Sequence, residues 1–247
     1  MELSVIASGS NGNCYLLEES GASVLIDAGI GLHETVQRLA ALGKDIRQLN
    51  GIVLSHAHSD HYQGIGPLSR NLDIPVYADR EVYKSCRERL GKVEIHHFQG
   101  CFQINGMVIT PVETSHDVVS FGFVVGSLGI FTDTGRVTGG MKEAMGNLKV
   151  VVLESNYDEE MLFHGPYPAH LKARIASDRG HLSNDDASDF ISRYGTHLSL
   201  VLLAHLSEKN NTVIKVKEAF ENLNGGSRYV VCSRLRQTGT YRINQED

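Results

Sequence analysis

The feature that most constrains the fold of this chain is a weak internal repeat. Each half begins with an apolar strand and a polar loop, continues into a predicted hairpin, and reaches an Asp-x-Gly sequence at 27–29 and again at 133–135. A helical pattern and a second apolar strand follow, at 51–54 and 150–153. Two similar β-rich halves favour two sheets covered by helices. The sequence therefore predicts an α/β protein with a four-layer αββα sandwich.

Length and composition allow one large domain. The 247 residues, 41% of them hydrophobic and 21% charged, are enough to bury a core and are typical of globular proteins. No linker-like segment interrupts the chain, so we predict a single domain over 1–247. The first residues do not resemble a signal peptide, and no stretch is long enough to span a bilayer. We therefore expect a cytoplasmic protein with no membrane partner.

The four cysteines are scattered and form no C-x-x-C pair, which argues against a zinc knuckle or a redox motif. We predict that they are small buried hydrophobic residues. The formal net charge is −6, so an anionic partner must be met by local positive charge or by metal.

The last third of the chain is predicted to be mainly helical. We expect a helix over 158–177 interrupted near Pro166 and Pro168, and another over 184–194 capped by Ser183 or Asn184. An apolar strand at 198–204, a helix over 213–223 and a strand at 229–232 should follow.

A dense group of metal-type donors follows the predicted strand at 51–54. The four donors are His56, His58, Asp60 and His61. A helix could not direct all four side chains inward, so we predict a loop here. Imidazole nitrogen and carboxylate oxygen suit zinc, manganese or iron.

Two ions would need more donors, and three candidates each follow another predicted strand. These are His116, Asp133 and His205. A lone histidine after a strand is more often an ordinary hydrogen-bonded residue, and this chain has 12 histidines. If the H-x-H-x-D-H motif binds metal, however, these three residues become candidate ligands as well.

These motifs resemble the metallo-β-lactamase superfamily across essentially the whole chain. The resemblance implies the αββα fold and two divalent metal ions, Zn or Mn, with Fe also compatible. It also implies that Asp133 bridges the two ions and that Asp27 supports the metal loop from behind, although Asp27 could equally be a turn residue. The implied ligands are His56, His58 and His116 for the first ion and Asp60, His61 and His205 for the second.

Two adjacent cations would lower the pKa of a bridging water toward neutrality and supply hydroxide near pH 7. Asp60 could accept a hydrogen bond from this nucleophile and orient it. Asp60 and His61 also argue against the oxygen-reducing diiron branch, which is expected to have an acid where His58 stands.

Two segments carry local excesses of positive charge. Residues 164–181 hold Lys172, Arg174 and Arg179 against Asp178, and residues 227–242 hold four arginines and no acid. In an acidic protein such excesses favour contact with an anion, although they could also be ordinary solvated faces.

A narrower resemblance is to the YycJ (WalJ) family. It is carried by seven stretches, 7–13, 55–61, 131–135, 154–158, 167–175, 177–184 and 203–207. It implies 5′→3′ DNA exonuclease activity linked to mismatch repair. A looser resemblance to the transfer-RNA 3′-processing nucleases and a phosphonate-pathway phosphodiesterase implies that His181 binds the scissile phosphate or protonates the leaving oxygen. Capping of the helix at Asn184 is the other possible role of His181.

We predict substrate contacts at Lys172, Arg174, Asn156, Ser10 and Asn11. The turn at 9–12 could instead be purely structural. No long arm and no insert of β-CASP size is present, so the substrate platform should be small.

The sequence thus predicts a dinuclear metal-dependent hydrolase, with DNA as substrate and an exonuclease as the leading hypothesis. Hydrolysis of a small phosphodiester, thioester or lactone stays open. So does a non-catalytic role in binding metal or a partner.

Overall fold

The computed structural model describes residues 1–221 and 228–244, and two compact units divide the chain. The first unit is Met1–Pro111 with the C-terminal segment from Ser233, and the second is Val112–Cys232. That residues 1–247 form a single domain stays a prediction.

The first unit is built on a seven-stranded sheet with the order β14-β1-β2-β3-β4-β5-β6. The strands are β1 (Glu2–Ala7), β2 (Cys14–Glu19), β3 (Ala22–Ile26), β4 (Gly51–Leu54), β5 (Val76–Ala78), β6 (Ile95–His97) and β14 (Gly239–Arg242). Pairs from β14 to β3 are antiparallel, and pairs from β3 to β6 are parallel.

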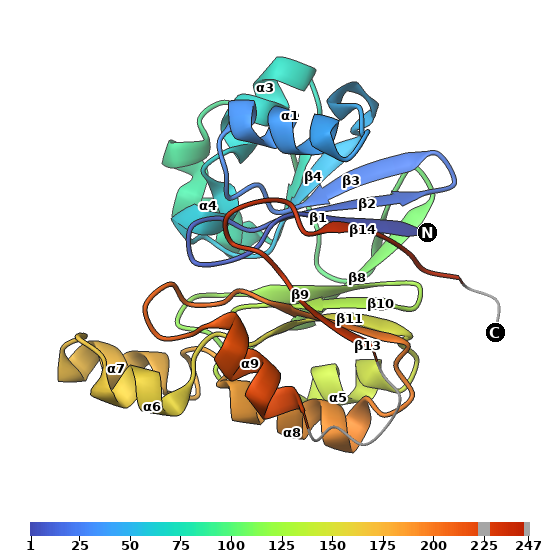
Figure 1. Ribbon diagram of the computed structural model, residues 1–247. Coiled ribbons are helices and arrows are strands. Elements are labelled where there is room, and N and C mark those ends of the chain that lie inside the picture. The colour runs from blue at the N-terminus through green and yellow to red at the C-terminus, as the bar shows by residue number, and fades with distance from the viewer. Residues whose placement is uncertain (222–227, 245–247) are drawn as a thin grey trace. The chain divides into compact units, whose positions relative to one another are not determined.

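Helices of the first unit lie over one face of this sheet, where α1 and α3 are seen in Figure 1. The helices are α1 (Leu32–Ala41), the 3₁₀ turn η1 (Ile46–Gln48), α2 (Ser59–Tyr62), α3 (Ile65–Leu72) and α4 (Arg80–Leu90). The predicted hairpin and the strand at 51–54 are confirmed.

The metal-type motif differs from the predicted loop. His56 and Ala57 do leave β4 in irregular backbone, but Ser59–Tyr62 forms the short helix α2 with His58 at its N-cap. The prediction of a loop throughout is therefore wrong for this second part. The turn of helix separates the donors into two pairs, one before it and one on it.

The second sheet has the order β13-β12-β11-β10-β9-β8-β7, and β8 carries the chain from the first unit into the second. The strands are β7 (Phe102–Ile104), β8 (Met107–Glu113), β9 (Phe121–Val125), β10 (Leu128–Phe131), β11 (Val150–Glu154), β12 (Leu200–Ala204) and β13 (Arg228–Val231). Strands β10 to β13 pair in parallel. All residues of β11 and β12 are buried, as is typical of central parallel strands.

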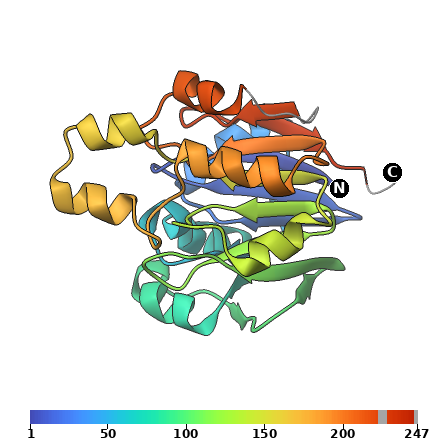
Figure 2. The same ribbon diagram turned by 90° about the horizontal axis from the view of Figure 1, so that it is seen from below.

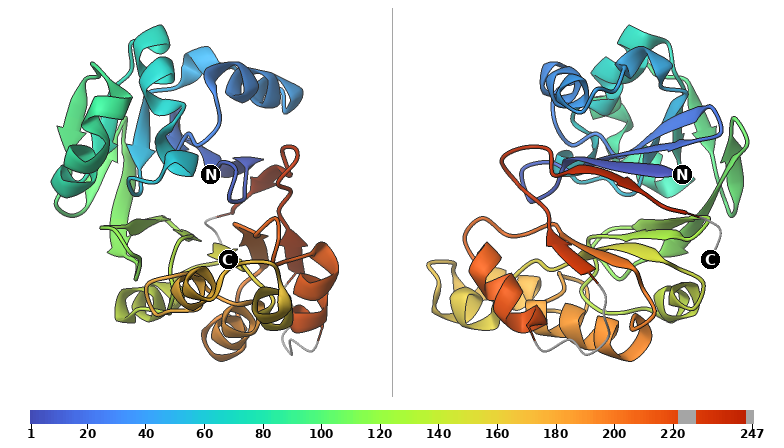
Figure 3. Two further views of the ribbon diagram at one scale, coloured as in Figure 1. Left: turned by 90° about the vertical axis from the view of Figure 1, so that its left-hand side faces the viewer. Right: turned by 45° about the vertical axis from the view of Figure 1, so that its right-hand side comes forward.

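Three helices of the second unit cover one face of this sheet, and α5 lies next to α8 (Figure 2). Helix α8 also lies beside α9 (Figure 3), where the Ser188 hydroxyl donates to the Ala219 carbonyl. The helices are α5 (Gly139–Met145), α8 (Asn184–Tyr194) and α9 (Val213–Phe220). The predicted helix 184–194 is confirmed with Ser183 as its cap. Positions 222 and 223 of the predicted helix 213–223 lie outside the described residues.

Between β11 and α8 the chain forms a helical hairpin that extends away from the sheet (Figure 2). It consists of α6 (Glu159–His164) and α7 (Ala169–Ile175), with Pro168 as the N-cap of α7. The predicted interruption at the prolines is confirmed, because proline removes a backbone donor and cannot continue a helix. In the described parts of the chain, we find no helix both long and apolar enough to cross a membrane.

Candidate metal centre

In the first unit the carboxyl ends of β3 and β4 bring Asp27 to the metal-type motif. These strands are parallel neighbours, so the residues that follow them emerge at one edge of the sheet. The Asp27 carboxylate accepts hydrogen bonds from the backbone and hydroxyl of Ser55 at 2.8 and 2.7 Å, and from His61 Nδ1 at 2.7 Å. The structure thus places Asp27 behind the motif, where it holds both the end of β4 and a candidate ligand.

Three imidazoles of the motif lie close together. The ring of His56 is 4.8 Å from that of His58 and 4.0 Å from that of His61, centroid to centroid. Because the Ser55 hydroxyl donates to Asp27, the 3.0 Å contact between His56 Nδ1 and that hydroxyl has the ring nitrogen as donor. In both His56 and His61, Nδ1 therefore carries the proton and Nε2 is the basic nitrogen.

Asp60 is the more accessible donor of the motif. Its side chain is 21% exposed, and its Oδ2 lies 3.5 Å from His61 Nε2. His56 and His61, in contrast, are fully buried. An acid at the open side of a group of buried imidazoles can reach both a bound ion and a water molecule.

Backbone contacts hold the motif in place and require a glycine. The Asn13 amide donates to the Asp60 carbonyl at 2.8 Å, and a Cβ built on Gly29 would lie 1.6 Å from that same carbonyl oxygen. No side chain fits at position 29. Ser10 and Asn11, predicted as substrate contacts, are exposed in the turn closed by the bond from Gly12 to Gly9.

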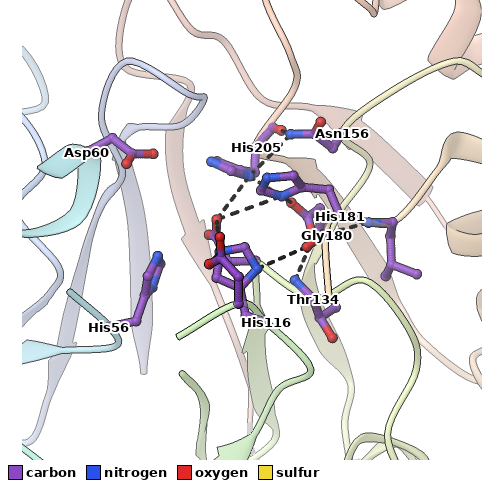
Figure 4. A network of polar contacts seen from close by, with 12 residues as sticks. His56, Asp60, His116, Thr134, Asn156, Gly180, His181 and His205 are labelled. Carbon is purple, nitrogen blue, oxygen red and sulfur yellow. Dashed lines mark hydrogen bonds and ion pairs between the residues drawn. The ribbon is translucent and has the colours of Figure 1, made fainter. Parts of the chain in front are cut away.

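In the second unit the parallel strands β10, β11 and β12 end side by side and bring four candidate donors together. They are Asp133, Glu154, His181 and His205. One donor atom from each lies within 4.8 Å of the others, and Figure 4 shows the rings of His181 and His205 on the same carboxylate network. His181 comes from the loop before α8 and joins the three residues that the strand ends supply.

Glu154 is the centre of this group and was not singled out from the sequence. Its carboxylate accepts from His181 Nδ1 at 2.8 Å, His205 Nδ1 at 2.7 Å and the Thr134 amide at 2.8 Å, and it is fully buried. A fourth, longer bond of 3.3 Å comes from the Leu182 amide. Burial alone would raise the pKa of Glu154, but His181 and His205 together hold it below its usual value.

His116 is oriented by the loop that precedes α8. Its Nδ1 donates to the Gly180 carbonyl at 2.9 Å, so Nε2 is the basic nitrogen, 3.9 Å from Asp133 Oδ1. A Cβ built on Gly135 would lie 2.3 Å from the Ser177 carbonyl oxygen, so the loop after Asp133 packs backbone to backbone against this segment.

Three site residues at strand ends adopt left-handed backbone. The φ angles of Asp27, Asp133 and His205 are 58°, 56° and 55°. Such a conformation is costly for residues other than glycine and concentrates at functional sites. Asp27 and Asp133 are the corresponding residues of the internal repeat, so the repeat extends to backbone conformation.

The predicted substrate contacts of the second unit have varied environments. Asn156 is buried, and its amide donates to the His205 carbonyl at 2.8 Å. Lys172 donates to the Phe163 carbonyl within the α6–α7 hairpin, and exposed Arg174 pairs with Asp117. Ser227 of the second basic segment lies outside the described residues.

The donor chemistry of each unit suits a divalent transition metal. Imidazoles whose Nδ1 is fixed by a carboxylate, hydroxyl or carbonyl are the form in which histidine commonly binds metal through Nε2. The first unit contributes two such rings, His56 and His61, together with His58 and the Asp60 carboxylate, and the second contributes rings beside Asp133. Both sets fit zinc, manganese or iron.

Comparison with known proteins agrees with this chemistry. A family model described as a beta-lactamase superfamily domain matches residues 22–206. The exodeoxyribonuclease WalJ of Streptococcus pneumoniae is 35% identical over 221 residues, covering 84% of this chain and 82% of the relative. The exodeoxyribonuclease YycJ of Bacillus anthracis is 33% identical over 225 residues, covering 85% and 84%.

Solved structures show the same fold. The metallo-β-lactamase fold protein YhfI of Bacillus subtilis superposes with a TM-score of 0.73 at 17% identity, covering 97% of this chain and 98% of that one. Zn²⁺-bound PqqB of Methylobacterium extorquens gives a TM-score of 0.74 at 12% identity, covering 98% and 100%. The predicted fold class is confirmed. The chain belongs to the metallo-β-lactamase superfamily, and within it to the family of the exodeoxyribonucleases WalJ and YycJ.

Proposed function

We propose that this protein is a dinuclear metal-dependent exodeoxyribonuclease. The observation that carries the proposal is the 33–35% identity, over about 84% of the chain, to two proteins named as exodeoxyribonucleases. The donor groups of both units support the metal dependence. The proposed ions are two divalent cations, zinc or manganese.

The proposed ligands are those that the family resemblance implied. His56, His58 and His116 would hold one ion, Asp60, His61 and His205 would hold the other, and Asp133 would contribute to both. The fixed tautomers of His56, His61 and His116 support this assignment, because each leaves Nε2 as the basic nitrogen. When bound, the ions supply Lewis acidity and an activated water.

Asp60 and His181 are the proposed proton-handling residues. Asp60 would accept a hydrogen bond from the attacking water and orient it. His181 is 21% exposed, and Glu154 fixes its Nδ1, so Nε2 is the nitrogen that would contact the phosphate or the leaving oxygen. Glu154 would act through His181 and would not touch the substrate.

The α6–α7 hairpin is the proposed platform for the nucleic acid backbone. It presents half-buried Lys172 and exposed Arg174, and exposed Arg179 lies four residues after the end of α7. Cations on a projecting element can contact phosphates without a large insert. Activity on a polymer should then fall steeply with salt, whereas hydrolysis of a small phosphodiester, thioester or lactone should not.

The test uses end-labelled DNA and several metals. Purified protein with Mn²⁺ or Zn²⁺ should release mononucleotides progressively from 5′-ends, and His58→Ala should abolish release. The matched control is His33→Ala, which removes an exposed histidine of α1. Failure to cleave DNA under any metal, or full activity of His58→Ala, would contradict the proposal.

A further inference from the structure

The second unit contains a cavity that the proposed hydrolysis does not use. Its volume is about 330 Å³, and it opens beside α5 and α8, the neighbouring helices of Figure 2. Its lining includes residues 135–137, Lys142 of α5, Tyr157 and several side chains of α8 between positions 186 and 194. We call it the α5–α8 cavity. Its size is at the lower end of pockets that enclose a small organic molecule.

The floor of the α5–α8 cavity is aromatic and has one polar group. Tyr157 is 4% exposed and Phe190 is 3% exposed, and both line the cavity. Within residues 1–221 and 228–244, no group hydrogen-bonds the Tyr157 hydroxyl. Burial, with a smaller contribution from Asp186, raises the pKa of Tyr157, so the hydroxyl stays protonated. The Tyr157 hydroxyl is not one of the fully buried polar atoms that lack a partner, so it is open to the cavity, where a ligand acceptor can hydrogen-bond it.

The rim carries both signs of charge. Arg136 and Lys142 have no carboxylate partner among the described residues, and Lys142 lies 5.8 Å from the centre of the Tyr194 ring. The side chain of Asp178 also has no partner in that part of the chain, and Asp186 accepts from the Ser183 hydroxyl. The two cations without a carboxylate partner favour an anionic group, whereas Arg193, which also lines the cavity, is paired with Asp189. The carboxylates disfavour a purely anionic ligand and favour one that also has N–H donors.

We propose that the α5–α8 cavity binds a nucleoside monophosphate. Arg136 and Lys142 would hold the phosphate. The base would lie against the aromatic residues, with its N–H groups toward Asp178 and Asp186 and an acceptor toward the Tyr157 hydroxyl. Each unpaired group of the cavity then gains a partner of matching chemistry.

A bound nucleotide would touch two segments that position the candidate metal centre. Gly135 lies two residues after Asp133, and Leu182 directly follows His181. The Ser115 hydroxyl, next to His116, donates to the Asp178 carbonyl at 2.7 Å. Occupation of the cavity should therefore slow amide exchange at 133–137 and 176–182. This goes beyond the proposed function, since the nucleotide would restrain the loops at 133–137 and 176–182 without being hydrolysed.

The experiment is calorimetric titration of deoxyadenosine monophosphate into the full chain in excess EDTA. Chelation removes binding of the phosphate to metal, so saturable binding that survives it belongs to the protein. Tyr157→Phe should weaken binding about fivefold or more, through loss of one hydrogen bond. Arg136→Ala should weaken it about tenfold. Lys217→Ala, on exposed α9 surface outside the cavity, should leave it unchanged.

Three outcomes would overturn the proposal. One is no binding at millimolar nucleotide, and another is unchanged affinity in both cavity variants. The third is equally tight binding of inorganic phosphate or of adenosine alone, since only part of the ligand would then be recognised. No turnover is measured, so a failure here is separate from a failure of the nuclease assay.

Discussion

Replacement of Glu154 by glutamine tests whether one buried carboxylate sets the tautomers of two histidines. Its Oε1 accepts from Nδ1 of His181 and His205, and its Oε2 accepts from the amides of Thr134 and Leu182. All four of these groups donate a hydrogen bond to the carboxylate. Glutamine has the same shape but replaces one acceptor with an NH₂ group, which must then face donors.

The two histidines can relieve that conflict only by changing tautomer. If the new NH₂ takes the place of Oε1, Nδ1 becomes an acceptor and the proton moves to Nε2, the nitrogen that a metal would need. We therefore expect a moderate stability loss of about 1–3 kcal/mol without metal. Metal affinity should fall about 10–100-fold, as is typical when the hydrogen-bond partner of a ligand is removed.

The stability difference should also depend on pH with a definite sign. The folded pKa of Glu154 lies below its ordinary value of 4.5. The charged carboxylate therefore contributes stability above that value, and this contribution is lost as the pH falls through the lower folded pKa. The gap in urea-unfolding free energy between wild type and Glu154→Gln should narrow below pH 4.5.

The assays are urea unfolding in EDTA and competition for Zn²⁺ with a chromophoric chelator. The matched control is Glu94→Gln, because Glu94 also pairs with a histidine, His96 Nε2 at 2.8 Å, but at the surface. That change should cost no more than about 0.5 kcal/mol and leave metal affinity unchanged. Metal affinity of Glu154→Gln within threefold of wild type would refute the tautomer argument.

Three further predictions test parts of the structure away from Glu154. Gly29→Ala should lower the unfolding free energy by more than about 2 kcal/mol, because the new Cβ would overlap the Asp60 carbonyl; a melting curve like that of wild type would contradict the packing. A thiol reagent should label exposed Cys101 at once and the three buried cysteines only in denaturant, so a native count above one would be inconsistent. Hydrogen bonds from Lys44 and, secondly, Arg242 lower the pKa of Glu2 to about 2, so Glu2→Gln should cost up to about 1 kcal/mol at pH 7 in chemical unfolding. That cost should vanish between pH 4.5 and 2, and a constant cost would refute the pairing.

The strand ends could be predicted from the sequence because each is marked locally. An apolar run followed directly by Asp27, or after one more residue by His56 or Asp133, shows both the strand and the point where polar chemistry begins. The same logic located His205 after β12. Segment 65–104 has no such contrast. Its strands β5 and β6 were not predicted, because three-residue strands carry too little periodicity, and the helices α3 and α4 were not predicted either.

The cysteine prediction shows where composition alone fails. Three thiols are buried, as predicted for small hydrophobic residues, and burial raises the pKa of Cys86 to about 11. Cys101 is exposed in the turn before β7. The sequence around a single cysteine does not show whether the thiol is buried or exposed. The exposure of Cys101 depends on the turn between the three-residue strands β6 and β7, which the sequence does not predict.

Glu154 shows why the ligands were easier to find than their supports, since Asp27 was suggested as a support only by the family resemblance. A metal ligand is recognised by residue type and by clustering along the chain, as in His56 to His61. A supporting carboxylate is defined by what it accepts from, and the donors to Glu154 lie 20 to 51 residues away. Glu154 is the last residue of the apolar strand β11. In the sequence it looks like any other strand end, because its partners come from β12 and from the loop before α8. Both supports hold Nδ1 of a candidate ligand, Asp27 that of His61 and Glu154 that of His205, but the two carboxylates stand at different positions of the repeat, so the repeat could not point from one to the other.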